Sequence, residues 1–494
     1  MLNVMLFPYA NVVIKLLEHL SNTVRIVLSC ILLNVMIPNC LAMEPVITRD
    51  QGTVETLRAT LQEIKQRHNI PCLSLGWVKD CNAPVQTVTL GCDAQAVLRW
   101  GSITKTLTAL TVLDLAAEDL IDLYAPISIY LDSRLWDNAW QTSQPIRVID
   151  LLELRAGFTD LSGRAFNYNQ PMPLAQALAF ERDQLRTFWP PGLQHSYSNL
   201  TPGLSQLLIE TVSGESYADA VNKRIFTPLQ MNSAGFKPGR ELLPGYQADG
   251  ITPIPYWQMT FAAFGAANAS TEDMLKLLAE LLEPTVLSEF ELQHLRTPHG
   301  RRYLPEFRFD YAAGFYPRIR RGFTWHNHGG DADGYRSRLS IMSDHPRGYV
   351  ANISSDNPAA LREVERAIEN FLIADLASPD IPAVFDLPVA ELAALTGQYY
   401  PSQTRFGLQK WQSGQMPGIE VVLRNKQLWF VTANKDTPLF ATSAHQFRRA
   451  SDPVATLAFV RVGQDLFLQG ELGHYARLTT CPTFLSFLRQ CNHR

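Results

Sequence analysis

A serine and a lysine three residues apart are the first candidates for covalent chemistry in this sequence. Ser102 and Lys105 form the only S-x-x-K pattern of the chain. In a helix this spacing is close to one turn, so the lysine amine lies on the same face as the serine hydroxyl. Burial would lower the pKa of the amine toward the value that a general base needs, and backbone N–H groups at a helix start can face a developing oxyanion. The pair predicts a serine nucleophile with a lysine base.

Two later segments carry groups that could serve such a nucleophile. Tyr197 and Asn199 lie on a predicted loop, where a phenol can relay a proton and an amide can position a substrate carbonyl. His328 ends a predicted strand and is followed by two glycines, the second being Gly330. Paired glycines let a backbone approach a ligand closely, so this strand is expected to line the site.

Other common catalytic and nucleotide-binding motifs are missing from the sequence. It has no G-x-S-x-G, no H-E-x-x-H and no G-x-x-x-x-G-K-[ST] pattern. His326 and His328 are two residues apart, but no Cys, Asp or Glu cluster with ligand spacing joins them. We therefore expect neither a metal nor a cofactor. His294 and His299 are expected to lie at the surface.

The elements around these residues predict a mixed α/β region that brackets a helical one. Apolar residues at helical spacing predict helices, and alternation of apolar and polar residues predicts strands. Ser102 would start a mostly apolar, buried helix over residues 102–117. The other predicted helices are 54–68, 148–154, 202–212, 216–225, 271–282 and 357–376, and the predicted strands are 72–78, 85–90, 312–316, 323–328, 337–342 and 348–354.

Short alternating stretches dominate the last hundred residues. They cover 397–400, 419–423, 427–431, 457–461 and 465–468. This texture predicts a separate β domain, with its boundary near 377–388. Trp411, Trp429 and Phe430 are expected in its core.

The first 42 residues have the pattern of a secretory signal. Lys15 and Arg25 lead into an apolar run of about twelve residues, which suits a signal peptide but falls short of the roughly 20 needed to span a bilayer. Cys40 and Ala42 make a small-x-small cleavage site. We expect cleavage near Ala42 and a periplasmic or secreted protein. An uncleaved membrane anchor is the alternative.

Cleavage there would leave an odd number of cysteines in an oxidising compartment. Cys81 and Cys92 flank the predicted hairpin, and Cys481 and Cys491 are separated by a short amphipathic stretch, so both pairs are candidate disulfides. Cys72 follows a proline in an apolar strand and is expected to be a buried small hydrophobe. One thiol must stay free or pair elsewhere.

Composition excludes several classes of protein and partner. The 494 residues are 46% hydrophobic and 18% charged, which excludes disorder, collagen and coiled coil. A net charge of -4 lacks the basic excess that neutralises phosphates, and no Lys/Arg run supplies one locally. We expect a small-molecule or peptide substrate and no nucleic acid. A membrane would be reached only through the N-terminal segment.

In this order, the serine–lysine pair, the tyrosine loop and the glycine strand make the chain resemble the serine β-lactamase and penicillin-binding protein superfamily. The resemblance is to its class C branch, with DD-carboxypeptidases, family VIII esterases and D-amino-acid peptidases, and it covers about residues 50–376. The similar segments are 99–105 (RWGSITK, for R-x-G-S-x-T-K), 120–127 (LIDLYAPI, for G-x-L-x-L-D-D-P-V), 228–231 (PLQM, for P-L-G-M) and 328–335 (HGGDADGY, for H-x-G-x-x-x-G-F). Residues 151–158 (LLELRAGF) depart from L-L-x-H-x-S-G-L, because the histidine is missing.

The resemblance implies a fold and a domain organisation. The fold would be a β-lactamase/transpeptidase-like α/β/α sandwich with an antiparallel sheet and a helical subdomain. Residues 395–399 (LTGQY) resemble the opening of the small β-barrel appended to many relatives. The expected organisation is a signal peptide or anchor at 1–42, a hydrolase domain at 45–376 with a helical subdomain at about 120–300, a barrel at 385–480 and a tail at 481–494.

The resemblance also implies roles for the first two motifs. Ser102 would be the acylated nucleophile, Lys105 its base and Tyr197 a second proton relay, and Asn199 would hold the carbonyl side of the substrate. The implied activity is hydrolysis of an ester, a D-amino-acid amide or a muropeptide-like peptide. The alternatives are a β-lactamase or DD-carboxypeptidase proper, and a non-catalytic penicillin-binding-like module.

The third motif departs from the family at the position of its lysine. His328 stands where the lysine of K-T-G lies in class C lactamases, which removes a permanent charge near the carboxylate of β-lactams. Efficient β-lactamase activity is therefore not expected. The backbone N–H groups of Ser102 and Asp331 would form the oxyanion hole. A replacement charge could come from the next strand, from Arg336 or Arg338.

Overall fold

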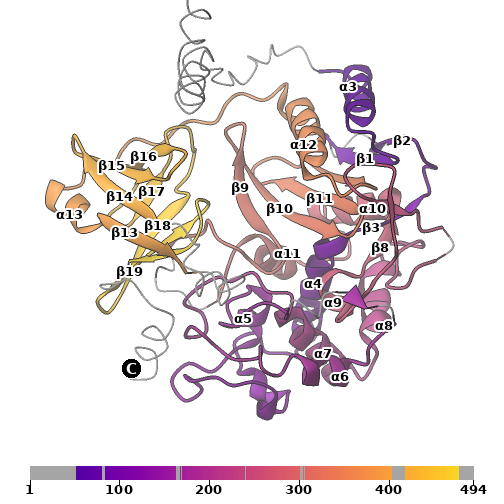
Figure 1. Ribbon diagram of the computed structural model, residues 1–494, viewed down its shortest axis with the longest axis horizontal. Coiled ribbons are helices and arrows are strands. Elements are labelled where there is room, and N and C mark those ends of the chain that lie inside the picture. Colours follow the sequence, from indigo (N-terminus) through magenta and orange to yellow (C-terminus); the bar gives the residue numbers. More distant parts are fainter. Residues whose placement is uncertain are drawn as a thin grey trace, which may run out of the picture. The chain divides into compact units, whose positions relative to one another are not determined.

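Figure 1 shows the computed structural model of the chain. It describes residues 52–80, 84–162, 167–168, 170–239, 241–300, 304, 306–402 and 418–477. The predicted leader, Cys81, Trp411 and the predicted tail at 481–494 lie outside the described residues. The predictions made for them stay predictions.

A six-stranded antiparallel sheet forms the centre of the region between residues 54 and 373, and its strand order is β2-β1-β12-β11-β10-β9. The predicted hairpin, β1 with β2, forms one edge of this sheet. Because β1 also pairs with β12, the start of the described chain is joined to strands that come more than 250 residues later. The strands are β1 (Leu73–Val78), β2 (Gln86–Leu90), β9 (Tyr316–Arg320), β10 (Phe323–Ala332), β11 (Tyr335–Met342) and β12 (Gly348–Ile353).

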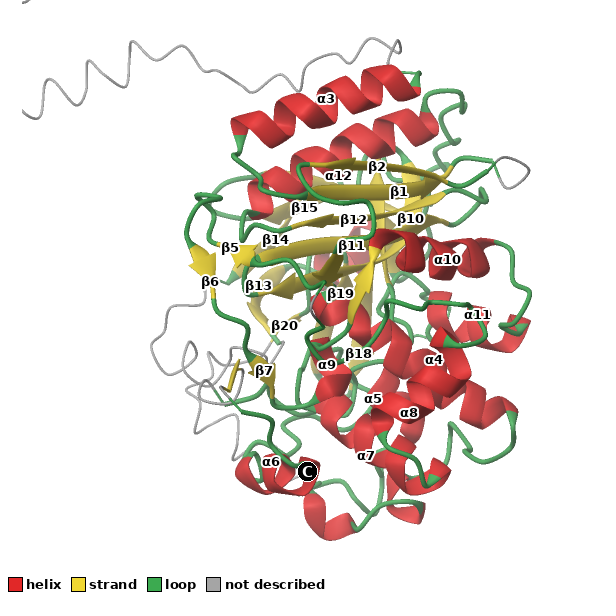
Figure 2. Cartoon of the chain, turned by 90° about the vertical axis from the view of Figure 1, so that its right-hand side faces the viewer, coloured by secondary structure: helices red, strands yellow, loops and turns green. Residues whose placement is uncertain are grey.

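Helices cover both faces of the sheet, as Figure 2 shows. α3 (Val54–Arg67) and α12 (Pro358–Ile373) pack on one face, and α10 (Thr271–Leu282) packs on the other. Alternation along β12 explains the two layers, because successive side chains of a strand point to opposite faces. Tyr349 and Ala351 join the cluster of α3 and α12, whereas Val350 joins the cluster of α10. The sandwich implied by the family resemblance is confirmed.

The predicted helical region is present, with α4 (Thr104–Ala117) buried along nearly its whole length. Its other helices are α5 (Val148–Leu152), α6 (Leu174–Phe180), α7 (Thr201–Ser213), α8 (Tyr217–Val221), α9 (Ala262–Gly265) and α11 (Glu289–Arg296). Short strand pairs, which the sequence did not predict, connect these helices. They are β3 (Val97–Arg99) with β8 (Asn268–Ser270), β4 (Asn167–Tyr168) with β7 (Gln258–Met259), and β5 (Gly245–Tyr246) with β6 (Pro253–Ile254).

A closed eight-stranded barrel follows, preceded by α13 (Val389–Ala394). Phe430 lies in its core as predicted, but Trp429 does not, because alternation along its strand turns it outward, where Arg424 lies over the indole ring. The strands are β13 (Gly397–Pro401), β14 (Ile419–Arg424), β15 (Gln427–Val431), β16 (Asp436–Ala441), β17 (Gln446–Arg448), β18 (Leu457–Val462), β19 (Asp465–Gly470) and β20 (Tyr475–Arg477).

The barrel and the hydrolase-like region share a small apolar cluster. Trp189 meets Phe467 of β19 edge to face, with ring centroids 5.8 Å apart, and its indole N–H donates to the carbonyl of Ser402. Leu193 and Ile319 belong to the same cluster. By its contacts, the chain from Gly52 onward is one compact unit.

Two sheet predictions were wrong in their bounds. β9 begins at Tyr316, so residues 312–315, predicted as strand, are not. β10 continues past His328 to Ala332, because residues 329–332 stay paired with β11. The glycines after His328 are therefore part of a strand.

The structure contains a disulfide between Cys72 and Cys92. Cys72 was expected to be a buried small hydrophobe, which is corrected, and the candidate pair of Cys81 with Cys92 is replaced by this pairing. The hairpin register explains the pairing: Leu73 lies opposite Leu90, which puts residues 72 and 92 at the same open end of the hairpin. Within the described residues, no helix has the length and apolar character required to cross a membrane.

Candidate active site

The serine and the lysine lie at the junction of a strand and a buried helix. β3 leads into a single 3-10 turn at Gly101–Ile103, and α4 starts at Thr104. Gly101 has a φ of +51°, and a Cβ there would lie 2.7 Å from the carbonyl oxygen of Asp331. Only glycine lets β10 approach this turn so closely. The turn presents Ser102 to a cavity.

Lys105 Nζ is buried and has three partners of its own. It lies 3.1 Å from Ser102 Oγ, 2.7 Å from Asn199 Oδ1 and 2.9 Å from the carbonyl oxygen of Phe264. An amide oxygen and a backbone carbonyl can only accept hydrogen bonds, whereas a hydroxyl can donate or accept. A neutral amine could therefore donate to the two acceptors and keep its lone pair directed at the serine hydroxyl.

The orientation of the Asn199 amide is set from behind by Asp160. The Asn199 side-chain N–H donates to Asp160 Oδ2 at 3.3 Å, and its backbone N–H donates to Asp160 Oδ1 at 2.7 Å. A carboxylate accepts only, so the amide oxygen is turned toward Lys105. Tyr197 is half-buried beside them, with Lys105 Nζ 4.7 Å from its ring centroid. The predicted tyrosine loop thus reaches the serine–lysine pair.

β10 forms the opposite wall through Gly330. A Cβ on this residue would lie 1.9 Å from the carbonyl oxygen of Trp100 and 2.2 Å from Ser337 Oγ. The backbone of Asp331 is consequently held against Gly101, next to Ser102. The side chain of Asp331 points away to solvent, where it pairs with Arg336 at 2.6 Å.

His328 is buried and carries no charge in the physiological range. Burial, followed by the charge of Lys105, lowers its pKa to about 3. Its Nδ1–H donates to the carbonyl oxygen of Gly329 at 2.7 Å, so Nε2 accepts from the Tyr311 hydroxyl at 3.1 Å. The position that holds a lysine in class C lactamases therefore presents a neutral ring.

Arg338 does not replace that charge as a free cation. Its guanidinium is paired with Glu365 and also donates to the Tyr316 hydroxyl and to Asn327 Oδ1. Arg336 is held between Asp331 and Asp356. Each of the two arginines suggested by the sequence is thus neutralised by a carboxylate.

The cavity at this site has a volume of about 590 Å³. It brings together the predicted residues Ser102, Tyr197, Asn199, His328 and Asp331. Lys105 lies beneath the serine rather than in the lining, and Gly330 acts through the backbone contact described above. Among the residues that the structure describes, no group of His, Cys, Asp and Glu side chains could hold a metal ion.

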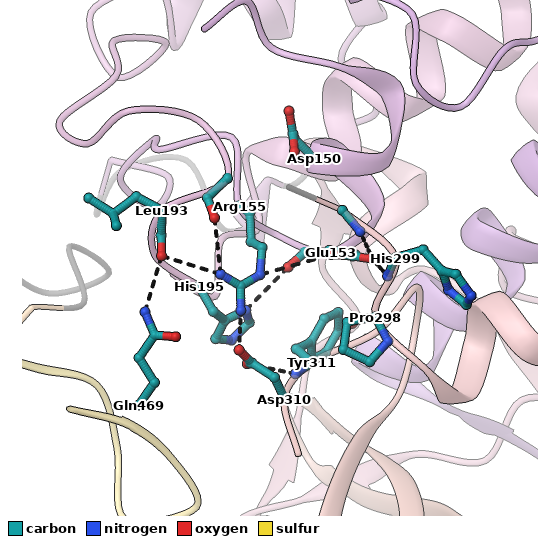
Figure 3. Close-up of polar contacts among 12 residues, drawn as sticks. Asp150, Glu153, Arg155, Leu193, His195, Pro298, His299, Asp310, Tyr311 and Gln469 are labelled. Carbon is teal, nitrogen blue, oxygen red and sulfur yellow. Dashed lines mark hydrogen bonds and ion pairs between the residues drawn. The ribbon is translucent and has the colours of Figure 1, made fainter. Parts of the chain in front are cut away.

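A buried ion network supports one wall of the cavity (Figure 3). Arg155 is paired with Asp310, lies 3.9 Å from Glu153, and donates to the carbonyls of Gly192 and Leu193. Burial alone would raise the pKa of the Asp310 carboxyl, but Arg155 holds it below its usual value. This network occupies the segment in which the family histidine is missing.

Several residues of the site had no signal in the sequence. Asp160, Phe264 and Tyr311 act through contacts with residues far along the chain, and no local pattern marks them. His195, which precedes the tyrosine loop by two residues, also lines the cavity and stacks on Tyr311 with centroids 5.0 Å apart. The expectation that His294 lies at the surface was wrong, because it is buried beside Phe290.

The comparisons with known proteins agree with this fold. A beta-lactamase family model matches residues 57–372. An unguisins hydrolase from Aspergillus campestris is 25% identical over 329 residues, covering 59% of each chain, so this chain spans about three fifths of that relative. A structure of the octameric penicillin-binding protein homologue from Pyrococcus abyssi is 19% identical with a TM-score of 0.56, covering 86% of this chain and 100% of that one.

A second solved structure has a similar fold but a shorter match. The D-amino acid amidase from Ochrobactrum anthropi SV3 is 19% identical with a TM-score of 0.55, covering 64% of this chain and 98% of that one. The family match covers more than half of the residues. The chain therefore belongs to the beta-lactamase family, with a closed eight-stranded barrel after the family domain.

Proposed function

We propose that this protein hydrolyses an amide or ester bond of a small D-amino-acid-containing substrate through an acyl-Ser102 intermediate. The observation that carries the proposal is the set of partners around Lys105 Nζ. Asn199 Oδ1 and the Phe264 carbonyl can only accept hydrogen bonds, whereas Ser102 Oγ, 3.1 Å from the amine, can give up a proton. Lys105 would remove that proton as Ser102 attacks the substrate carbonyl.

The remaining roles follow from the positions around the nucleophile. The backbone N–H groups of Ser102 and Asp331 would stabilise the oxyanion, each contributing about 2.7–4 kcal/mol to transition-state stabilisation. Tyr197 would pass a proton to the leaving group, and Asn199 would orient the lysine as well as the substrate. Water would then hydrolyse the acyl-serine by the reverse sequence of proton transfers.

The charge of the site favours a substrate without a carboxylate beside the scissile bond. His328 is neutral and Arg338 is paired, whereas a β-lactam or a D-Ala-D-Ala terminus carries its carboxylate at that position. The similar solved structures include a D-amino acid amidase, and one curated relative is a hydrolase named for unguisins. Amides and esters of D-amino acids, with muropeptide-like peptides, are the substrate class we favour.

Intact-protein mass spectrometry tests this proposal against its alternatives. The protein and its Ser102→Ala variant are exposed separately to a penicillin, to an activated short-chain ester and to D- and L-phenylalanine amide. We expect Ser102-dependent turnover of the ester and the D-amide without a lasting penicillin adduct. A stable penicillin adduct would favour the penicillin-binding reading, and no Ser102-dependent modification by any compound would refute the proposed enzyme.

We also propose that the chain works in an oxidising compartment, periplasmic or extracellular. The disulfide between Cys72 and Cys92 supports this, since such bonds are rare where thiols are kept reduced. The test is the mass of the protein recovered from its producing cell. A chain that begins near residue 43 in the exported fraction supports the proposal, and a full-length chain confined to the cytosol contradicts it.

A further inference from the structure

A second cavity, of about 420 Å³, adjoins the candidate active site. The two cavities share four lining residues, His195, Tyr311, Tyr316 and Arg338. The rest of the second lining comes from Phe309 and Asp310, from β9, and from the barrel turn between β19 and β20, which includes Glu471 and His474. A substrate held at Ser102 could therefore extend past the two tyrosines toward the barrel.

The barrel turn is built to hold a fixed position against β9. The backbone N–H of Ile319 donates to Glu471 Oε1 at 3.4 Å, and the same carboxylate is paired with Arg449 of the barrel. Gly470 has a φ of +131°, and a Cβ there would lie 2.1 Å from the carbonyl oxygen of Thr456. This turn thus contributes a defined wall to the second cavity.

Most charges around the second cavity cancel in pairs. Each buried arginine or carboxylate of the lining has an ion-pair partner within 4 Å, and these pairs are Arg318–Glu365, Arg318–Glu369, Arg338–Glu365, Arg155–Asp310 and Arg449–Glu471. Burial and the neighbouring positive charges lower the pKa of both His195 and His474, so neither ring adds charge near neutral pH.

Arg320 is the exception in this lining. It is exposed at the end of β9, and its side chain makes one long hydrogen bond, 3.4 Å from Nη1 to the carbonyl oxygen of Ile319. Within the described part of the chain it has no ion-pair partner within 4 Å. Arg320 is thus the one arginine in the lining of this cavity that the described residues leave without an ion-pair partner.

We propose that the second cavity is a substrate subsite in which Arg320 binds a carboxylate on the leaving portion of the substrate, at least one residue beyond the scissile bond. This rests on the proposed function. The direction follows from Asp333, which lines the first cavity and not the second and suits the ammonium group of the acyl portion. Tyr311 and Tyr316 would flank the chain that connects the two portions.

Three probes test the subsite. D-Phenylalanyl-glycyl-glycine has a remote carboxylate, its C-terminal amide lacks that charge, and D-phenylalanine amide lacks the extension. Arg320→Gln should lower kcat/KM for the tripeptide acid by about tenfold, chiefly through KM, because a charge-assisted contact remote from the reacting atoms is lost. For the tripeptide amide and for D-phenylalanine amide, kcat/KM should change by less than about twofold. Arg362→Gln, at an exposed arginine of α12, is the matched control.

Binding provides a readout that does not depend on turnover. In the Ser102→Ala background, calorimetry should give about tenfold weaker binding of the tripeptide acid when Arg320 is also changed to Gln, with the tripeptide amide unaffected. Equal affinities of acid and amide for the Ser102→Ala protein would overturn the subsite. If the natural protein does not hydrolyse D-phenylalanine amide at all, that result counts against the proposed function rather than against the subsite. The two failures are therefore distinguishable.

Discussion

At the scale of single residues, neutrality is the property that separates this site from a β-lactamase site. The chain buries His328 beside Lys105 and satisfies both ring nitrogens with neutral partners, Gly329 and Tyr311. A second positive charge at this position would repel the Lys105 amine when that amine is protonated. The neutral ring avoids that repulsion but gives up the attraction for an adjacent carboxylate.

The uncharged state of the His328 ring predicts how the stability of the protein depends on pH. The pKa of His328 is about 3 when folded and near 6.5 when unfolded, so the unfolded chain binds more protons between those values. The free energy of unfolding of the natural protein, minus that of His328→Asn, should rise with pH by up to about 1.4 kcal/mol per pH unit below pH 6.5. Above about pH 7 the difference should be flat.

Urea unfolding of both proteins from pH 4.5 to 8 measures this difference directly. Taking the difference removes the titration of groups common to both proteins, including Glu369 and Glu471, whose raised pKa values act in the opposite direction. A difference that stays constant across the range would show that His328 binds protons as readily in the folded protein as in the unfolded chain, which contradicts the prediction.

At the scale of elements, the site depends on how closely β10 approaches the turn before α4. The predicted strand ended at His328, but its continuation to Ala332 brings Gly330 against Trp100. Pairing with β11 straightens this segment and fixes which backbone N–H groups face Ser102. Two glycines, one on each element, make the approach sterically feasible.

Gly330→Ala should therefore damage the site far more than a glycine substitution elsewhere. The added methyl would meet the Trp100 carbonyl oxygen at 1.9 Å, which forces β10 away from the turn. We expect a loss of about 1–3 kcal/mol in the free energy of unfolding and at least a hundredfold loss of ester turnover. The measurements are urea unfolding and steady-state kinetics.

Gly235→Ala is the control, because a Cβ there has no neighbour within 4 Å. This variant should leave the free energy of unfolding and the ester turnover nearly unchanged. Equal activity of the two variants would mean that β10 does not supply the oxyanion hole.

At the scale of the whole molecule, the disulfide and the barrel contribute to the protein in different ways. The disulfide closes the open end of the β1–β2 hairpin at the sheet edge. The barrel packs its β19 side against Trp189 and contributes a wall to the second cavity. The first feature acts on stability, and the second acts on the substrates that the site can accept.

Removing the disulfide should cost about 3 kcal/mol in the free energy of unfolding, because it closes a loop of about 20 residues in the unfolded chain. The double variant Cys72→Ala/Cys92→Ala, unfolded in urea beside the natural protein, measures this cost. Dithiothreitol should bring the natural protein toward the stability of the variant. Rapid labelling of both thiols in the native, unreduced protein would contradict the assignment.

Local patterns were enough to predict that Lys105 lies beside Ser102, and they predicted most of the broad architecture. Helical spacing alone places Lys105 beside Ser102, because neighbours three residues apart share a helix face whatever surrounds them. Alternation likewise predicted the paired strands of the hairpin and most of the central sheet. The barrel was predicted in part, since β16, β17 and β20 are short or polar and were missed.

Tertiary structure decided what no local pattern carries. Asp160 orients Asn199 and Tyr311 binds His328 through contacts made possible only when distant segments fold together. The pairing of Cys72 with Cys92 depends on hairpin register. Within the described residues, Arg320 lacks an ion-pair partner because the neighbouring carboxylates are paired with other arginines. Spacing along the chain determines which groups a helix or strand presents, whereas burial and partnership, which set charge and orientation, exist only in the folded molecule.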